Sequence, residues 1–463
     1  MKVKQIAILL LMIPALFSCD PPSEITLTIG DKKDLAAMIP PKFSSESLTW
    51  ASSDSEVASV SDNGIVTAVG FKGGGGRIFN MEPASGSAVI TVTSGKLSYS
   101  ITVNTVLKGT VDIMNLPPMK DSYKDYFMIG NIFNPRDVDS LGIENEWLTH
   151  HYNILTAENS MKPSSISSSQ DNYNFNSADR MVNAALASGL KVHGHTLIWH
   201  SQIPQWQKEM ANKDRATALA AMRKFITDVM THYKGKIYSW DVMNEIFTDG
   251  VGSSTADWKT SIRQENPWFA AIGADFVYEG YLAARLADPG AVLYYNDYNT
   301  DQSNKARVIA NMVREVNNRY KQAYPNETRL LIEGIGMQEH HNTGVRAFSI
   351  RNTLELFKPL GVKVSAAELD LLAQSWSEFR GSTGSGIGKD ADSTVTNRGL
   401  LDQAELYKQY MKLYMEYSDI IERVSVWGVT DDLSWRSGGL PLLFDANNKA
   451  KPAYYGFVSA LED

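Results

Sequence analysis

The sequence has almost no cysteine, because Cys19 is the only one among 463 residues. A single cysteine this close to the start excludes disulfides within the chain and a thiol nucleophile in the rest of it. Positive charge is also in short supply, with a formal net charge of -8. Binding to phosphate backbones needs clustered Lys and Arg, so we expect no nucleic-acid partner. A neutral polymer or a small molecule fits this composition better.

Sequence motifs for several common chemistries are missing too. No Gly-rich phosphate loop follows a strand-like run, and no Gly-x-Ser-x-Gly element indicates an acyl enzyme. His193 and His195 lie two residues apart on a strand-like run and would point the same way, but the sequence offers no obvious third metal ligand. We therefore expect neither a metal ion nor a cofactor.

Residues 1–19, MKVKQIAILLLMIPALFSC, have the pattern of an export signal. Two lysines precede an apolar run from Ile6 to Phe17, which is too short for a comfortable membrane span. The segment resembles a bacterial lipoprotein signal, in which Cys19 becomes the acylated first residue of the mature protein. We expect attachment to the outer membrane or cell surface through this lipid only, or a position facing the periplasm. The alternative is an ordinary cleaved signal in which Cys19 is incidental.

Residues 24–106 are rich in Ser, Thr, Val and Gly, with alternating runs such as ITLTIG, SAVITVTS and YSITVNTV. Short strands at this spacing predict a small β-sandwich. The stretch LTWASSDSEVASVSDNGIVTAV resembles the bacterial immunoglobulin-like family 2 module, although a longer loop, GFKGGGGRIFNMEPASG, follows it. We expect a spacer or protein-contact domain; glycan binding is the alternative, for which no aromatic platform is evident.

A Pro-containing linker is predicted over residues 107–125, and the pattern changes again over residues 126–463. Eight strand-like runs alternate there with amphipathic stretches such as 215–233 and 304–324: YFMIGNIF, NILTAENS, KVHGHTLIWH, KIYSWDVMNEIF, AVLYYNDYN, LLIEGIGMQEH, KVSAAELD and ERVSVWGVTDD. Eight such units predict an α/β fold, a closed (β/α)8 barrel. A doubly wound open sheet is the alternative, but it would more often carry a Gly-rich turn after its first strand.

Unexpected polar and aromatic residues gather where these runs end: Glu158, Asn159, His195, Trp199, His200, Asn244, Glu245, Asn296, Tyr298, Gln338, His340, Glu368, Asp370 and Trp427. Any one of them could be a loop anchor, a surface charge or a packed core residue. Together they indicate a site, because the carboxyl ends of barrel strands form one mouth where active sites lie.

Two glutamates surrounded by amides and aromatic rings are the groups that glycoside hydrolysis needs. One carboxyl group must be protonated to donate to the leaving oxygen, and the other must be ionised. Aromatic rings stack on sugar faces and amides bond hydroxyl groups. Glu245 and Glu368 are the natural pair.

Residues 126–463 resemble the family 10 glycoside hydrolases, the endo-β-1,4-xylanases. Seven segments carry the resemblance in the family's order: LTAENSMKP, GHTLIWHSQIPQW, WDVMNEIF, IGMQEH, AELDL, WGVTDDLSWR and LLFDANNKAKPAYYG. The resemblance implies that Glu245 is the general acid/base and that Glu368 is the nucleophile of a retaining mechanism. It also implies xylan or xylo-oligosaccharides as substrate, and we expect a monomer.

The resemblance further implies substrate-binding positions around this pair. Asn244 would bond the 2-hydroxyl group of the sugar, and Tyr298 would stack beyond the scissile bond. Three tryptophans would wall the subsite before that bond: Trp199, Trp427 and Trp435. Three polar side chains would hold the next sugar: Glu158, Asn159 and Lys162. Three others would lie near the catalytic pair: His195, Gln338 and His340.

Two features depart from the family pattern. Glu339 stands where the family usually has a small residue, and its carboxylate would either alter nearby pKa values or point away and contact a subsite. The Gly- and Ser-rich segment 374–400 suggests a loop over the mouth, in which Trp376 could offer a sugar platform, or an insertion without function.

The sequence leaves two other functions open. One is a β-1,4-glucanase or a hydrolase of mixed specificity with the same carboxylate pair. The other is a non-catalytic glycan-binding lipoprotein, against which the presence of Glu245 and Glu368 argues.

Overall fold

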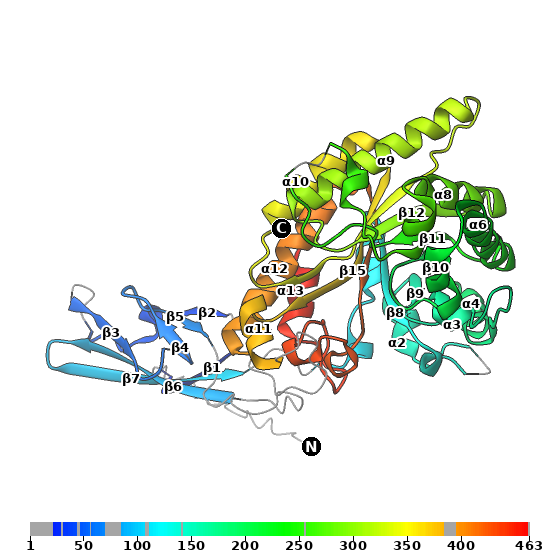
Figure 1. The fold of residues 1–463 in the computed structure, drawn as a ribbon. Helices are drawn as coiled ribbons and strands as arrows, with labels where there is room; N and C mark the ends of the chain where they lie inside the picture. Colours follow the sequence, from blue (N-terminus) through cyan, green and yellow to red (C-terminus); the bar gives the residue numbers. More distant parts are fainter. Residues whose placement is uncertain are drawn as a thin grey trace, which may run out of the picture. The chain divides into compact units, whose positions relative to one another are not determined.

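A computed structural model describes residues 22–28, 31–43, 47–55, 57–69, 85–106, 111–139, 142–253, 256–383 and 395–461. The predicted signal with Cys19 and most of the long loop after residue 69 lie outside the described residues. The described residues divide into two compact units, one formed by residues 22–69 and 85–106 and the other by residues 111–461 (Figure 1). Within the described part, no helix is both long and apolar enough to span a bilayer.

The N-terminal unit is built from two sheets. The first has the order β1 (Glu24–Thr28), β7 (Leu97–Val106), β6 (Ser85–Ser94), β3 (Thr49–Ser52), and the second has the order β2 (Lys32–Asp34), β5 (Ile65–Ala68), β4 (Ala58–Val60). Along β6, Ala88, Ile90 and Val92 are buried and alternate with less buried residues, as expected for a strand with one face on a core. The predicted immunoglobulin-like sandwich is confirmed.

The C-terminal unit is a closed barrel of parallel strands (Figure 1). The strands are β8 (Met128–Phe133), β9 (Ile154–Ala157), β10 (Lys191–Ile198), β11 (Ser239–Asn244), β12 (Val292–Asp297), β13 (Gly334–Met337), β15 (Lys363–Leu372) and β16 (Ile421–Val426). The last strand pairs with the first, with Arg423 opposite Met128, so the sheet has no open edge there. The barrel prediction is confirmed, and the open sheet is excluded. A short strand, β14 (His340–Asn342), extends the pairing beside the end of β15.

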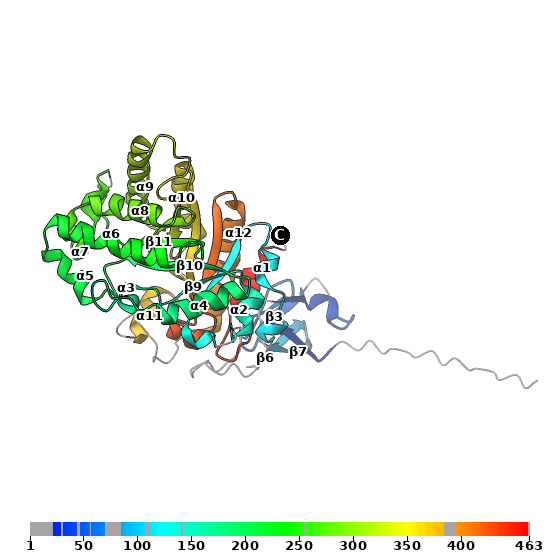
Figure 2. The same cartoon turned by 90° about the vertical axis from the view of Figure 1, so that its right-hand side faces the viewer.

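Helices cover the outside of this barrel (Figure 2). The longer ones are α4 (Asn176–Ala187), α6 (Arg215–His232), α8 (Asp275–Ala287), α9 (Ser303–Ala323), α10 (Ala347–Phe357), α11 (Trp376–Thr383), α12 (Asn397–Glu416) and α13 (Pro452–Ser459). The shorter ones are α1 (Met119–Ser122), α2 (Glu146–His151), α3 (Pro163–Ile166), α5 (Gln205–Glu209) and α7 (Pro267–Ile272). The side chain of Asp214 caps α6 by accepting from the backbone N–H of Thr217 at 3.0 Å. The predicted helical stretches near 215–233 and 304–324 are therefore present.

The linker predicted over residues 107–125 is too long. Ile113, Met119 and Tyr123 are buried in the hydrophobic core of the barrel unit. The phenol of Tyr123 donates to the backbone carbonyl of Phe457, and its ring stacks on Phe127 with centroids 5.4 Å apart. The proline pair in this stretch precedes α1 instead of marking a free tether, because proline is well tolerated where a helix begins.

Candidate active site

A cleft of about 800 Å³ is lined by all of the predicted catalytic and substrate-binding residues, whereas His200, Asn296 and Asp370 do not line it. The predicted lining residues are Glu158, Asn159, Lys162, His195, Trp199, Asn244, Glu245, Tyr298, Gln338, His340, Glu368, Trp427 and Trp435. They lie in the carboxyl-terminal halves of strands between β9 and β16 or in the segments that follow these strands, as the barrel topology requires. Other lining residues were not predicted as ligand contacts: Gln202, Asp249, Asn299, Asp301, Gln302, His341, Asn342, Val345 and Arg436.

Glu245 follows the last residue of β11 and has a left-handed backbone with φ of 52°. Its carboxylate is partly exposed and accepts hydrogen bonds from three nitrogen donors. Trp199 Nε1 donates to Oε2 at 2.9 Å, while Gln338 Nε2 and Asn244 Nδ2 donate to Oε1 at 2.9 and 3.3 Å. The group is thus fixed in orientation by neutral donors and still open to the cleft.

Glu368 lies within β15 and is 5% exposed. Asn296 Nδ2 donates to Oε1 at 2.7 Å, and His340 Nε2 lies 3.1 Å from Oε2. Burial raises the pKa of Glu368, but the hydrogen bond from His340, the electrostatic influence of the two nearby histidines and the bond from Asn296 together bring that pKa below its ordinary value. The buried carboxylate is therefore held in its ionised form.

His340 lies between two carboxylates. Its Nε2 faces Glu368 and its Nδ1 lies 3.0 Å from Asp370 Oδ2, so both contacts are satisfied only by the doubly protonated ring. Burial lowers the pKa of His340, but the charges and hydrogen bonds of Asp370 and Glu368 raise it to about 9. Asp370 also accepts from Trp435 Nε1 at 2.9 Å and from the guanidinium of Arg436.

A second polar chain lies beneath the cleft. His195 Nδ1 and His193 Nε2 contact the same oxygen, Asp241 Oδ2, at 2.8 and 3.0 Å. The prediction that the two histidines point the same way is therefore confirmed. Burial raises the pKa of Asp241, but the two histidines bring it below its ordinary value. No cluster of three or more metal-ligating side chains occurs among the residues that the structure describes.

The walls of the cleft combine rings with polar groups. Lys162 Nζ lies 5.1 Å from the ring centroid of Trp199 and donates to Asn159 Oδ1 at 2.9 Å. Burial lowers the pKa of Lys162, although three glutamates of the cleft oppose this. The phenol of Tyr298 contacts Asp249 and accepts from Arg263 at 2.5 Å. These contacts fix the rings and leave hydroxyl-bonding groups along the cleft.

The subsite contact expected of Glu339 is wrong, because its carboxylate does not line the cleft. Its side chain is 1% exposed, points away from the cleft and contacts His341, Tyr414 and Thr300. It is absent from the cleft lining and from the causes of the lowered pKa of Glu368. The expected effect on nearby pKa values is present, because Glu339 raises the pKa of His341 above its ordinary value against the opposing effect of burial.

Trp376 begins α11 and lines the cleft with 43% of its surface exposed. Phe379 lies behind its ring at a centroid distance of 5.7 Å, and the guanidinium of Arg436 lies over the ring at 5.7 Å. The part of the predicted loop at 384–394 lies outside the described residues.

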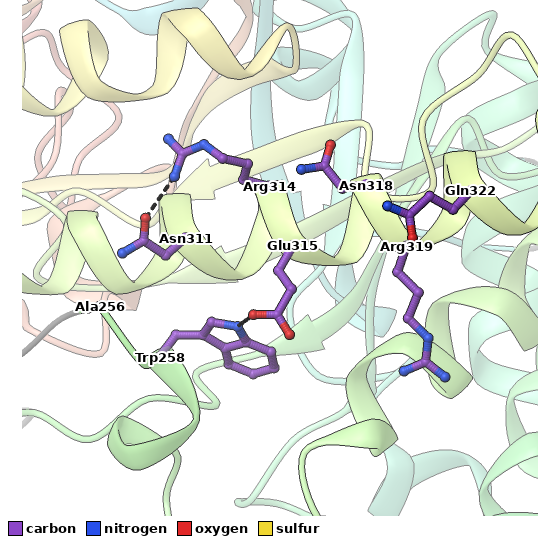
Figure 3. A pocket seen from close by; sticks show the side chains of 8 residues that line it. All are labelled: Ala256, Trp258, Asn311, Arg314, Glu315, Asn318, Arg319 and Gln322. Atoms are coloured by element: carbon purple, nitrogen blue, oxygen red, sulfur yellow. Dashed lines mark hydrogen bonds between the residues drawn. The ribbon is translucent and has the colours of Figure 1, made fainter.

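A different hollow lies between α9 and the segment around Trp258 (Figure 3). It is lined by Asn311, Arg314, Glu315, Asn318, Arg319 and Gln322, with Ala256 and Trp258 opposite. Trp258 is only 3% exposed, and its Nε1 donates to Glu315 Oε2 at 2.8 Å. The ring therefore has no open face for a sugar, and the hollow lacks a pair of facing carboxylates.

The geometry of the cleft agrees with comparisons to known proteins. The sequence model of glycosyl hydrolase family 10 matches residues 118–460. The chain belongs to this family.

Individual relatives extend this family assignment. An exoglucanase, XynX, from Acetivibrio thermocellus is 32% identical over 77% of the chain and 31% of its own length. An endo-1,4-beta-xylanase from Geobacillus stearothermophilus is 32% identical over 74% of the chain and 99% of its own length. The chain spans about 31% of the length of several of the longer family 10 relatives.

A crystal structure of a family 10 xylanase with a bacterial Ig-like domain, from termite gut, matches both units of the chain. It is 62% identical with a TM-score of 0.79, and the match covers 95% of this chain and 98% of that one.

Proposed function

We propose that the protein is a retaining endo-1,4-β-xylanase that cleaves internal β-1,4-xylosidic bonds of xylan. The observation that carries this proposal is a pair of carboxylates in one cleft with different surroundings. Glu245 is partly exposed among neutral donors, whereas Glu368 is buried beside the protonated His340. The names of the Geobacillus and termite-gut relatives, both xylanases, support the substrate class.

Two amides connect the proposed catalytic residues. Asn296 Nδ2 contacts both Glu368 Oε1 at 2.7 Å and Asn244 Oδ1 at 3.0 Å. Gln338 Nε2 contacts the same Asn244 oxygen at 3.3 Å and Glu245 Oε1 at 2.9 Å. The carboxylates thus border a common space, which supports a nucleophile and an acid acting on one bond.

In the proposed reaction, the ionised Glu368 attacks the anomeric carbon while Glu245 gives its proton to the leaving glycosidic oxygen. The bond to that oxygen breaks, and a covalent glycosyl-enzyme forms on Glu368. Glu245, now ionised, takes a proton from water as the water attacks the anomeric carbon and releases Glu368. Asn244 is assigned to the 2-hydroxyl group of the sugar.

The remaining cleft residues are assigned to sugar binding. Trp199, Trp427 and Trp435 would wall the subsite before the scissile bond, with His195 beside the nucleophile. Glu158, Asn159 and Lys162 would hold the next sugar, and Tyr298 would stack beyond the bond. Crowding of the C5 side by tryptophan rings and Lys162 favours a pentose, which lacks the hydroxymethyl arm.

Two experiments test the proposed function. The purified protein should release reducing ends from xylan and not from carboxymethylcellulose. The reverse result would favour the glucanase alternative. That alternative is supported by one relative, which is named an exoglucanase. Glu368→Ala should abolish hydrolysis, and added azide should then give a glycosyl azide of inverted configuration. Unchanged hydrolysis of xylan by this variant would refute the nucleophile assignment, and a wild-type protein that binds xylan without cleaving it would favour the non-catalytic alternative.

We also propose that the protein is held at the bacterial surface by a lipid on Cys19, with the sandwich domain as a spacer. The support is the sequence pattern of residues 1–19, with an apolar run that ends at this cysteine. Cys19→Ala should move the protein from the membrane fraction to a soluble or secreted fraction. Retention of the variant in the membrane fraction would refute the anchor.

A further inference from the structure

The first and last residues of the segment Gln338–His340 each contact one of the proposed catalytic carboxylates. Gln338 Nε2 donates to Glu245 Oε1 at 2.9 Å, and His340 Nε2 lies 3.1 Å from Glu368 Oε2. The backbone carbonyl of Gln338 also accepts from the N–H of Glu368 at 3.0 Å. A small displacement of this segment would therefore change the position of both carboxylates at once.

The middle residue, Glu339, faces the opposite way and is fixed by three partners. His341 Nε2 lies 2.9 Å from Oε2, Tyr414 donates its phenol proton to the same oxygen at 2.6 Å, and Thr300 Oγ1 lies 3.4 Å from Oε1. Thr300 follows β12, His341 belongs to β14 and Tyr414 belongs to α12. One carboxylate thus ties the segment to two separate parts of the barrel wall, the loop after β12 and α12, and also to its own neighbour in β14.

The charge of Glu339 is compensated within the wall. Burial lowers the pKa of His341, but Glu339 and Asp301 bring that pKa above its ordinary value. The raised pKa favours the protonated form of His341, whose Nε2 lies 2.9 Å from the buried carboxylate of Glu339. Removing one partner from a buried ion pair destabilises strongly, because an uncompensated charge stays behind.

The backbone of Glu339 is in the left-handed region, with φ of 60°. A non-glycine residue in this rare conformation persists only where its surroundings impose it. The three contacts of the carboxylate supply that constraint. The backbone carbonyl of Glu339 adds another, because it accepts from the N–H of Asp370 at 3.3 Å.

From this geometry we propose that Glu339 is a positioning residue, whose buried carboxylate holds Gln338 and His340 against the two catalytic carboxylates. The inference rests on the proposed function, since it takes Glu245 and Glu368 as the reacting groups. Glu339 itself touches neither of them and is not a catalytic residue.

Glu339→Gln tests this role, because it keeps the shape of the side chain and removes its charge. We expect kcat on xylan to fall about tenfold or more with KM within about twofold, since misplaced catalytic groups mainly slow the chemical step. Glu422→Gln is the matched control. The side chain of Glu422 is 8% exposed and likewise accepts from two tyrosines, Tyr238 at 2.7 Å and Tyr294 at 2.6 Å, and pairs with Lys363, but it lies near the start of β16.

Both variants should lose stability in thermal unfolding, and only Glu339→Gln should lose kcat. An unchanged kcat in folded Glu339→Gln, or an equal loss in both variants, would overturn the proposal. If Glu339→Gln does not fold, Tyr414→Phe, which removes one hydrogen bond to the same carboxylate, should lower kcat by a smaller factor; an unchanged kcat would overturn the role.

A readout without substrate separates this inference from the proposed function. The crystal structure of Glu339→Gln should show Gln338 or His340 displaced from its carboxylate partner. If the wild-type protein does not cleave xylan, the proposed function is refuted. The crystal structure of Glu339→Gln would still decide whether Glu339 positions Gln338 and His340. Unmoved Gln338 and His340 would overturn the positioning role.

Discussion

Replacement of His340 by Gln should shift the acid limb of the activity profile to higher pH. His340 bonds the buried carboxylate of Glu368 as a cation, at 3.1 Å. A hydrogen bond to a charged group contributes about 1.5 to 3 kcal/mol, and charge-assisted bonds are about twice as strong as neutral ones. With a neutral glutamine as donor, the ionised form of Glu368 therefore loses about 1 to 1.5 kcal/mol of stabilisation. This loss raises the pKa of Glu368 by about one unit.

The assay is the pH dependence of kcat/KM on an aryl β-xylobioside, which reports the ionisation of the free enzyme. The acid limb reports Glu368, which must be ionised to attack, and it should move up by about one unit. The basic limb serves as an internal control, because His340→Gln leaves the contacts of Trp199 and Gln338 with Glu245 intact. An acid limb that stays in place or moves down would refute the electrostatic role of His340.

The same substitution makes a prediction for stability. Because the pKa of folded His340 is raised to about 9, its protonation stabilises the fold fully below the ordinary value near pH 6.5, and this contribution is lost as pH rises through 9. The lowered pKa of Glu368 acts in the other direction, with a contribution present above the ordinary value near 4.3 and lost as pH falls through the lowered pKa. The difference in unfolding free energy between wild type and His340→Gln, measured in urea, should therefore be largest between about pH 4.5 and 6.5 and shrink above pH 9.

Two further substitutions separate binding from stability. Trp376→Ala should raise KM for xylan by about two- to tenfold, because one stacking contact with the polymer is lost. KM for an aryl β-xylobioside should stay unchanged. An equal rise in KM for both substrates would show that Trp376 only supports Arg436. Lys451→Met breaks a buried pair with Asp431 at 2.8 Å and should lower the free energy of unfolding by about 3 to 5 kcal/mol, measured in urea. Its hydrogen bonds to the carbonyls of Leu440 and Leu442 are lost as well, so a change below about 1 kcal/mol would contradict the structure.

The barrel and the cleft could be predicted because their signals are local. Each strand carries its own apolar run, and each polar residue at its end is placed by the strand it follows. The pair Glu245 and Glu368 needs only the knowledge that parallel strands open at one mouth. Asn296 and Asp370 were visible as strand-end residues, but their hydrogen bonds to Glu368 and His340 depend on side-chain directions that a pattern does not contain.

The features that escaped prediction depend on contacts between distant segments. Ile113 and Tyr123 look like linker residues until α13 supplies the carbonyl of Phe457 and an apolar surface. Arg436 follows a predicted tryptophan directly, yet its role comes from Asp370, on another strand. Likewise, a carboxylate beside a catalytic segment predicts an electrostatic effect, and only the positions of His341 and Tyr414 show that Glu339 faces the wall.

The two proposed catalytic carboxylates differ because the barrel gives them different neighbours. Glu368 lies inside β15, where burial would neutralise it if His340 did not supply a positive charge. Asp370 and Arg436 continue that chain as alternating charges, so the imidazolium is itself stabilised. Glu245 lies one residue beyond β11, where it meets the cleft and only neutral donors. The barrel thus holds Glu368 ionised and ready to attack, while the carboxylate of Glu245 stays open to the cleft.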